Sequence, residues 1–221
     1  MTSPTNPEVL PLLTAWEPSR PRLTWYGDDG ERVELSGRVL RNWVVKAANL
    51  LVAECDAGPG TAVRLDLPAH WRLLVWALAV RAAGAEVLLG DDGGDPVVVV
   101  TDHPERWSGG AVEVVAVPLP ALARAWPGDL PAGALDGAAD LMGQPDEPMF
   151  AASGPAGART TGAPGARVLL EAHDPAALLE RAWACWREDG SVVVVTPRED
   201  DAVATIREQE GAVAEDPLRG R

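Results

Sequence analysis

Hydrophobic and polar positions alternate in two short runs near the amino terminus. Residues 23–26 (L-T-W-Y) and 32–35 (R-V-E-L) flank the turn-forming sequence G-D-D-G-E. Alternation on both sides of such a turn predicts a β-hairpin. From Ser36 to Glu54 the spacing becomes helical, with apolar residues on one face. Ser36 is the expected cap of this helix, because its hydroxyl can accept a hydrogen bond from a first-turn N–H group.

Beyond residue 60, apolar runs of strand length alternate with helical patterns. The helix predicted at 69–83 is apolar nearly all round, which places it inside the core. The strand at 97–101 begins with four valines, as in a strand buried on both faces. We expect further strands at 61–67, 85–89 and 112–117, and a short helix at 104–107.

The same rhythm returns near the carboxyl terminus. We expect strands at 167–170 and 191–195, with a helix between them that Asp174 caps and Pro175 begins. An exposed helix is expected at 200–209. Strands alternating with helices in this way predict an α/β fold: a layered, mostly parallel sheet flanked by helices, with an amino-terminal β-hairpin.

Composition divides the chain into three segments. Residues 1–126 are expected to form an amino-terminal α/β unit. Residues 127–165 are rich in Gly, Pro and Ala, which predicts a mobile linker. Residues 166–221 are expected to continue the sheet and to end in a charged, solvated tail from residue 198 onward.

Charge and hydropathy exclude several classes of partner. A formal net charge of −14 argues against nucleic acid and anionic membranes. The longest apolar run, 73–80, is far shorter than the roughly 20 residues of a membrane span. Residues 1–10 show no secretory signal, so a cytoplasmic protein is expected. Cys55 and Cys185 are expected to be reduced, buried thiols, and the nine tryptophans to lie mainly in the core.

One stretch could bind a phosphate group: residues 150–165, F-A-A-S-G-P-A-G-A-R-T-T-G-A-P-G. The backbone N–H groups of such a loop can surround anionic oxygens, but phosphate-handling enzymes usually add a cation. The only lysine, Lys46, lies far away in the first long helix, and the nearest cations are Arg159 and Arg167. The candidate nucleotide-binding residues are Ser153, Gly154, Thr160, Thr161 and Gly162.

The remaining polar residues predict no catalytic group and no metal site. His70 is expected to cap a helix or to lie at the surface, and His103 to lie in a loop between Asp102 and Pro104. His173 lies beside the expected cap Asp174, where sites of α/β proteins form. The histidines and cysteines lack zinc-binding spacing. The acidic loop at 91–95 lacks the glutamate that ends a calcium-binding loop, and Ser153 lacks the G-x-S-x-G sequence of a hydrolase.

Residues 79–89, A-V-R-A-A-G-A-E-V-L-L, are similar to the L-K-A-G-A-x-x-V-P-L stretch of adenylate-forming enzymes. This superfamily includes acyl-CoA synthetases, luciferases and peptide-synthetase adenylation domains. Residues 22–117 resemble its amino-terminal portion, and residues 166–195 do so more weakly. The nearest likeness is to a short actinobacterial group that keeps only this portion. The resemblance implies the layered α/β fold of that portion.

The phosphate loop of this family, T-S-G-T-T-G-x-P-K-G, is only partly matched. Ser153 and Gly154 match its first half and residues 160–164 its second half, but no gapless placement fits both. In the second placement Gly165 stands where the family has lysine. The resemblance implies that this lysine helps to bind the ATP phosphates, so its loss removes stabilisation of the transition state. The later motifs for adenine, magnesium and ribose, and the carboxy-terminal lobe, are not found downstream of Val195.

These observations favour a truncated, catalytically inactive relative of AMP-dependent acyl-CoA synthetases that acts as a binding or regulatory domain without a cofactor. The alternative is an acyl-adenylating (acyl-CoA) ligase activity completed by a partner chain. It would use ATP, AMP and Mg, with Arg159 or Arg167 in place of the lysine. A third possibility is a structural protomer that associates through exposed tryptophans: Trp16, Trp107 or Trp126. The partner is left open as another protein or a second copy.

Overall fold

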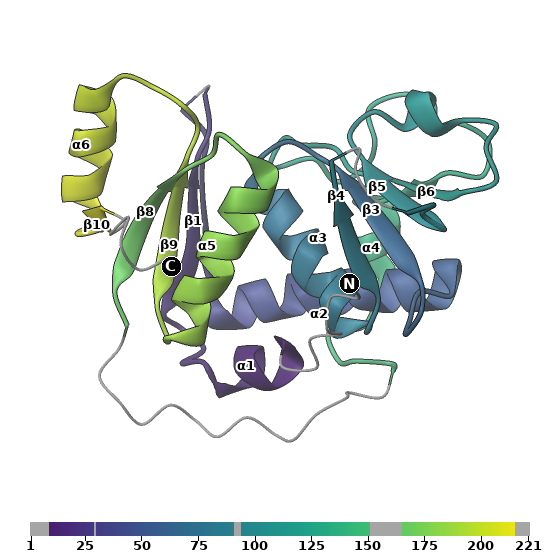
Figure 1. Ribbon diagram of the computed structural model, residues 1–221, viewed down its shortest axis with the longest axis horizontal. Helices are drawn as coiled ribbons and strands as arrows, with labels where there is room; N and C mark the ends of the chain where they lie inside the picture. The colour runs from purple at the N-terminus through teal and green to yellow at the C-terminus, as the bar shows by residue number, and fades with distance from the viewer. Residues whose placement is uncertain (1–8, 29, 91–93, 151–164, 215–221) are drawn as a thin grey trace.

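The computed structural model describes residues 9–28, 30–90, 94–150 and 165–214, whose strands form two five-stranded sheets (Figure 1). Sheet A has the order β10-β8-β9-β1-β2, and sheet B the order β4-β3-β5-β6-β7. Paired strands run parallel, except that β1 and β2 form an antiparallel hairpin.

The elements of sheet A are β1 (Pro21–Tyr26), β2 (Arg32–Ser36), β8 (Arg167–Glu171), β9 (Ser191–Val195) and β10 (Val213–Ala214). Those of sheet B are β3 (Ala62–Asp66), β4 (Glu86–Leu89), β5 (Val98–Thr101), β6 (Glu113–Ala116) and β7 (Leu135–Asp136). The helices are α1 (Val9–Ala15), α2 (Gly37–Cys55), α3 (Trp71–Ala82), α4 (Ala139–Gly143), α5 (Pro175–Arg187) and α6 (Asp200–Gln209), with a 3₁₀ helix η1 (Pro104–Trp107).

The predicted α/β fold class is confirmed, and each predicted helix and strand lies within two residues of its expected bounds. The number of sheets differs from the prediction. The β1–β2 hairpin pairs with β9 and not with the strands of residues 62–116 that follow it in sequence. Sheet A therefore combines strands from the first and the third predicted segments.

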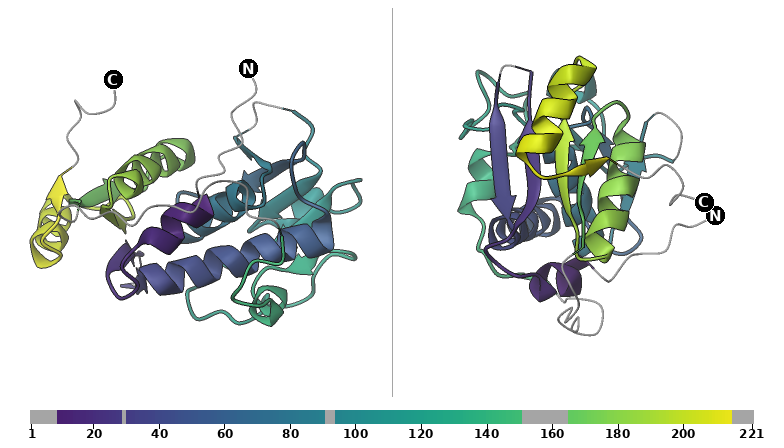
Figure 2. Two further views of the ribbon diagram at one scale, coloured as in Figure 1. Left: turned by 90° about the horizontal axis from the view of Figure 1, so that it is seen from below. Right: turned by 90° about the vertical axis from the view of Figure 1, so that its left-hand side faces the viewer.

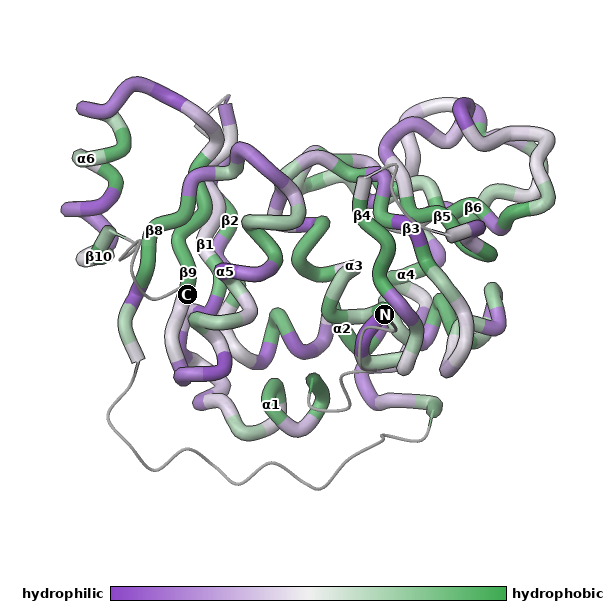
Figure 3. Tube along the Cα trace, viewed as in Figure 1, coloured by the Kyte–Doolittle hydropathy of each residue, from purple (hydrophilic) through white to green (hydrophobic). Residues whose placement is uncertain are grey.

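Helix α3 lies between the two sheets and contacts β1, β3 and β4 as well as α1, α2 and α5 (Figure 1). Its residues 71–80 are all buried, which confirms that the helix without a polar face lies in the core. Helix α5 covers one face of sheet A, and α6 lies over the other (Figure 2). The hydropathy colouring in Figure 3 follows this arrangement, with apolar residues along the central strands and α3.

Helix starts agree with the sequence signals. The Ser36 hydroxyl accepts a hydrogen bond from the Val39 N–H group, and the Asp174 carboxylate accepts one from Ala177. Helix α3 begins at Trp71, because Nδ1 of His70 accepts a hydrogen bond from the Arg72 N–H group at 3.2 Å. The capping role of His70 is therefore confirmed, but the side chain is buried and not at the surface.

The structure differs from the predicted linker over residues 127–150. This segment contains β7, which extends sheet B, and α4, whose Leu141 is buried. Side chains of α2 hold the segment that follows. The Lys46 ammonium donates to the carbonyls of Met142 and Gln144, and the Asn49 amide donates to the carbonyls of Pro145 and Glu147. The only lysine of the chain thus anchors the segment that sequence composition describes as a linker.

Replacing Asn49 with alanine is expected to lower the free energy of unfolding by about 2 kcal/mol. The change would leave two carbonyls and the Met149 N–H group, which donates to Asn49 Oδ1 at 2.9 Å, without their partner. Asn49 is fully buried, so water cannot readily replace the amide. Urea denaturation measures the effect. The matched control is Asn42→Ala on the more exposed part of α2, expected within about 0.5 kcal/mol of the wild type; equal effects at both positions would contradict the anchoring role.

Candidate functional site

The five candidate nucleotide-binding residues lie outside the described residues. These are Ser153, Gly154, Thr160, Thr161 and Gly162, and Arg159 lies outside as well. The structure does describe both flanks of the stretch, which are Phe150 after α4 and Gly165 before β8. Gly165 reaches sheet A where β8 and β9 begin, at the amino-terminal edge of the sheet.

Gly165 has no room for a side chain. A Cβ atom there would lie 2.7 Å from the backbone nitrogen of Gly190 and 2.9 Å from the carbonyl carbon of Asp189, and closer still to the carbonyl oxygen of Glu188. All three atoms belong to the turn between α5 and β9, so moving them would disturb the strand that follows. The position that one of the two placements of the phosphate-loop pattern aligns with a lysine is therefore compatible only with glycine.

Two arginines of the amino-terminal edge of sheet A meet this turn. The Arg20 guanidinium donates to the carbonyls of Gly165 and Asp189 at 2.8 and 2.9 Å. Arg22 forms a 2.6 Å ion pair with the Asp189 carboxylate and donates to the Asp189 and Gly190 carbonyls. Burial lowers the pKa of Arg22, and Asp189 opposes that change. These arginines carry positive charge to the end of the candidate loop, but they already bind the protein's own oxygens.

The other cations considered from the sequence are also engaged. Lys46 forms an ion pair with Asp146 at 3.2 Å in addition to its carbonyl contacts. Arg167 at the start of β8 forms an ion pair with Glu210 and donates to the Thr24 hydroxyl at 2.9 Å. In the described structure neither side chain is available to an external phosphate without losing these contacts.

The carboxyl ends of β1 and β6 meet across the two sheets. The Glu31 carboxylate accepts hydrogen bonds from the indole N–H group of Trp25 and the backbone N–H group of Ala121. Arg72 at the start of α3 donates to the carbonyls of Leu119 and Pro120 at 3.3 and 3.0 Å. These contacts close the seam between the sheets and leave Arg72 almost fully buried.

The three histidines do not form a catalytic arrangement. Burial, with a smaller contribution from Arg72, lowers the pKa of His70 to about 3, so its ring stays neutral while Nδ1 caps α3. His103 lies beside Asp102 and Glu105 at 3.6 and 3.5 Å, and its side chain is exposed. His173 is exposed too and pairs with Glu171 at 3.2 Å.

In sheet B the strand order changes direction between β3 and β5, because β4 lies on one side of β3 and β5 on the other. Open α/β sheets commonly bind ligands at the carboxyl ends of the two strands that flank such a point. At their carboxyl ends the Asp66 carboxylate accepts hydrogen bonds from the Thr101 hydroxyl at 3.0 Å and the Trp107 indole at 2.9 Å. The protein's own side chains thus occupy one oxygen of Asp66. Within the described ranges, no group of three or more His, Cys, Asp or Glu residues is placed to hold a metal ion.

The expected tail from residue 198 onward contributes to sheet A. The Glu210 side chain is only 10% exposed, and its carboxylate accepts hydrogen bonds from Tyr26, Arg32 and Arg167. The segment 200–214 supplies α6 and β10, and Ile206 is buried against the sheet. The amino-terminal part of α6 is exposed as predicted, but Glu210 is not solvated.

Acid is expected to weaken the attachment of Glu210. Partial burial alone would raise the pKa of Glu210, but hydrogen bonds from Tyr26, Arg167 and Arg32 outweigh it and lower the pKa to about 2. A depressed pKa stabilises the fold above the unfolded value near 4.5, and this contribution is lost as the pH falls toward 2. At pH 7 Glu210→Gln should cost about 2 kcal/mol in urea denaturation.

The difference between wild type and Glu210→Gln should shrink to less than half at pH 2.5. A difference that stays constant between pH 7 and pH 2.5 would contradict the low pKa. Glu34→Gln is the matched control, because Glu34 binds the same Arg32 at 2.7 Å from an exposed position. Its effect should stay within about 0.5 kcal/mol.

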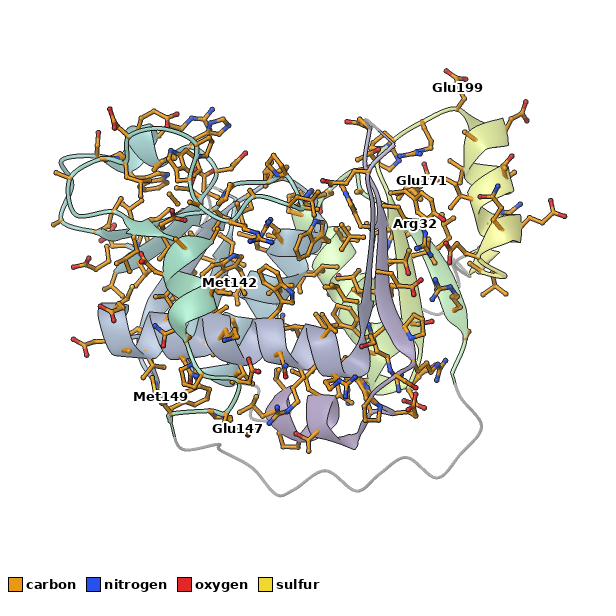
Figure 4. The ribbon with its side chains drawn as sticks, turned by 180° about the vertical axis from the view of Figure 1, so that it is seen from behind. Arg32, Met142, Glu147, Met149, Glu171 and Glu199 are labelled. Atoms are coloured by element: carbon orange, nitrogen blue, oxygen red, sulfur yellow. The ribbon has the colours of Figure 1, made fainter. Side chains whose placement is uncertain are left out.

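The tryptophans lie mainly in the core. Five of them are buried, and Trp16 is among these, so the proposal of association through an exposed Trp16 is wrong. Trp107 and Trp126 are partly buried. Cys55 is a buried free thiol, whereas Cys185 is only partly buried. The large exposed apolar side chains of the described residues include Leu122, Met142 and Met149; Figure 4 shows both methionines beside α2.

The part of the chain that the structure describes contains no helix that is both long and apolar enough to cross a membrane. No protein-family model matches the chain. A curated protein of Mycobacterium tuberculosis (strain ATCC 25618 / H37Rv), described only as a family protein, is 39% identical over 106 residues. The match covers 47% of this chain and 44% of that protein.

Solved structures of adenylate-forming enzymes share the fold. An acyl-CoA synthetase of Brucella canis aligns with a TM-score of 0.68 and 16% identity, covering 92% of this chain and 46% of its own. The acetoacetyl-CoA synthetase of Streptomyces lividans aligns with a TM-score of 0.65 and 19% identity, covering 93% and 41%. MatB of Rhodopseudomonas palustris aligns with a TM-score of 0.63 and 15% identity, covering 92% of this chain and 48% of its own.

The chain therefore has the fold found in the amino-terminal part of adenylate-forming enzymes, which confirms the fold that the sequence resemblance implied. It spans less than half the length of the proteins it matches. Residues 79–89, which carry that resemblance, form the end of α3 and the strand β4.

Proposed function

We propose that this chain forms a non-catalytic domain that has the architecture of the amino-terminal part of adenylate-forming enzymes and acts by binding a partner. The observation that carries this proposal is the environment of Gly165. A lysine at this position would have to pass through the backbone of the α5–β9 turn. Under the placement that aligns Gly165 with the family's lysine, the packing of the α5–β9 turn accounts for the absence of that cation.

The engagement of the nearby arginines supports the same proposal. Stabilising a triphosphate requires a cation whose donors are free to bind phosphoryl oxygens. Arg20 and Arg22 donate to backbone carbonyls and Asp189, and Arg167 binds Glu210. Recruiting any of them to a nucleotide would break contacts that hold sheet A together.

Two measurements on the full chain test the proposal. We expect isothermal titration with ATP and Mg to give no saturable heat, and incubation with ATP and a panel of carboxylic acids to release no pyrophosphate. An active acyl-CoA synthetase assayed in parallel is the positive control. Release of pyrophosphate that depends on both ATP and a carboxylic acid would overturn the proposal.

The second candidate is an acyl-adenylating ligase activity completed by a partner chain. It is favoured by the fold that the chain shares with acyl-CoA synthetases. Under this alternative Arg159 supplies the cation, so Arg159→Ala should abolish nucleotide binding. Nucleotide binding that is absent from the wild type, or unaffected by the change, would count against it.

The 39% identity over 106 residues with the M. tuberculosis protein supports placing the chain in an actinobacterial group of such domains. The partner is then another protein or a second copy of the chain. Light scattering of the purified chain at increasing concentration distinguishes these two, because only self-association raises the mass of the sample on its own.

A further inference from the structure

On the outer face of sheet A, which α6 partly covers, the carboxylate of Glu210 accepts four hydrogen bonds. Oε1 of Glu210 accepts from the Tyr26 hydroxyl and from Nε and Nη2 of Arg32, at 3.2 and 2.9 Å for the two nitrogens. Oε2 accepts from Nη2 of Arg167. Two guanidiniums and a phenol thus surround a single carboxylate.

All these donors belong to sheet A, and none belongs to the segment that carries Glu210. Tyr26 lies on β1, Arg32 on β2 and Arg167 on β8. Glu210 follows α6 and precedes β10. The carboxylate is therefore a ligand supplied by one segment to a set of donors assembled on another part of the fold.

Contacts independent of Glu210 hold the donors in position. Arg167 donates to the Thr24 hydroxyl at 2.9 Å and to the Ser191 hydroxyl at 3.5 Å. Both hydroxyls are buried. The Arg32 guanidinium lies 5.6 Å from the centre of the Tyr26 ring, and its Nε also donates to the Tyr26 hydroxyl. The three donor side chains would therefore stay close to their positions if the Glu210 carboxylate were removed.

The segment 200–214 is held by few other contacts. Its apolar anchor is a small cluster separate from the main core, to which it contributes Ile206, Val203 and Ala212. Strand β10 pairs with β8 through two residues only. Segments with little buried apolar surface open at low free-energy cost, so α6 and β10 form a unit that can separate from the sheet.

Charge supports an anionic occupant. Arg32 and Arg167 carry two positive charges, which Glu210 and the exposed Glu34 balance. Departure of Glu210 leaves one uncompensated positive charge on a partly buried surface lined by hydroxyls. Bidentate and charge-assisted hydrogen bonds from guanidinium groups suit the planar geometry of a carboxylate.

We propose that Tyr26, Arg32 and Arg167 form a carboxylate-binding site on the outer face of sheet A, that Glu210 occupies it as an internal ligand, and that an external carboxylate binds there when segment 200–214 is displaced. None of the three donors belongs to residues 150–165, so the proposal does not rest on nucleotide binding by that stretch.

Acetate is the probe, because Glu210→Ala removes a fragment of the size and charge of acetate. Sodium acetate at 100 mM is expected to raise the unfolding temperature of Glu210→Ala by about 2 to 4 °C relative to sodium chloride at the same ionic strength. The wild type should show no acetate-specific shift, because its own carboxylate fills the site at high effective concentration. If Glu210→Ala is unfolded in chloride, acetate should restore its far-ultraviolet circular dichroism.

Two control variants make the result specific. Glu210→Ala combined with Arg167→Ala should lose the response to acetate, because one side of the carboxylate is then unbound. Glu171→Ala removes an exposed carboxylate from the other end of β8 and should show no acetate response. Figure 4 labels both Glu171 and Arg32. Equal unfolding temperatures of Glu210→Ala in acetate and chloride, or an equal response in the double variant, would overturn the proposal.

Discussion

Replacing Asp189 with asparagine is expected to lower the free energy of unfolding by about 3 to 5 kcal/mol, the range for breaking a buried ion pair. Arg22 is fully buried, and its only carboxylate partner in the described structure is Asp189 at 2.6 Å. Without this charge the guanidinium stays away from water with backbone carbonyls as its remaining partners. Urea denaturation at neutral pH measures the loss.

Asparagine is chosen because Asp189 has a left-handed backbone conformation with φ of 61°, which asparagine tolerates. Asp56 provides the matched control. It has φ of 51° at the carboxyl end of α2 and is exposed. Asp56→Asn should change stability by less than about 0.5 kcal/mol. Similar effects at the two positions would show that backbone conformation, and not the ion pair, determines the cost.

Placing lysine at position 165 is expected to destabilise the protein by about 3 kcal/mol or more, and to confer no nucleotide binding. The new Cβ atom would press on the backbone of residues 188–190 and displace the turn that presents Asp189 to Arg22. Gly165→Ala should cost nearly as much, because the clash begins at Cβ. Thermal unfolding and titration with ATP and Mg measure the two effects.

Gly143→Ala is the control for a glycine without such neighbours. Apart from its chain neighbours and the backbone of its own helix, no atom of the described residues lies within 4 Å of a Cβ placed at Gly143, at the end of α4. This change should be neutral or slightly stabilising, since alanine favours helix more than glycine does. A stable Gly165→Lys protein that binds ATP would contradict both the steric reasoning and the proposed function.

Local patterns in the sequence predicted the helices and strands well. The four-valine runs, the caps Ser36 and Asp174, and the all-apolar helix around residue 75 are each decided by neighbouring residues. Pairing between distant strands is not encoded locally. A valine-rich strand such as β9 can pair with any parallel neighbour, so its position beside β1 could not be read from the sequence.

Glycine- and proline-rich composition was misleading between residues 127 and 150. The segment contains few large apolar residues, but Leu141 and the backbone carbonyls after α4 find partners on α2. A buried asparagine and a lysine far away in sequence provide these partners, and no local signal marks them. The same holds for Arg22 and Asp189, which are 167 residues apart.

The sequence predicted only part of the role of Gly165. One of the two placements of the phosphate-loop pattern puts Gly165 where the family has lysine, but the sequence could not distinguish simple loss of that lysine from its steric exclusion. That distinction depends on the turn at residues 188–190, which the topology of sheet A brings against Gly165.

The composition of sheet A also has a consequence for synthesis on the ribosome. Strand β1 is made early, but its parallel neighbour β9 ends at Val195. Until then the nascent hairpin presents an open edge of Leu23, Thr24 and Trp25, available to other chains. Sheet B is complete by residue 136 and can form first. Closure of sheet A thus depends on late pairing between strands far apart in the sequence, which makes folding slow.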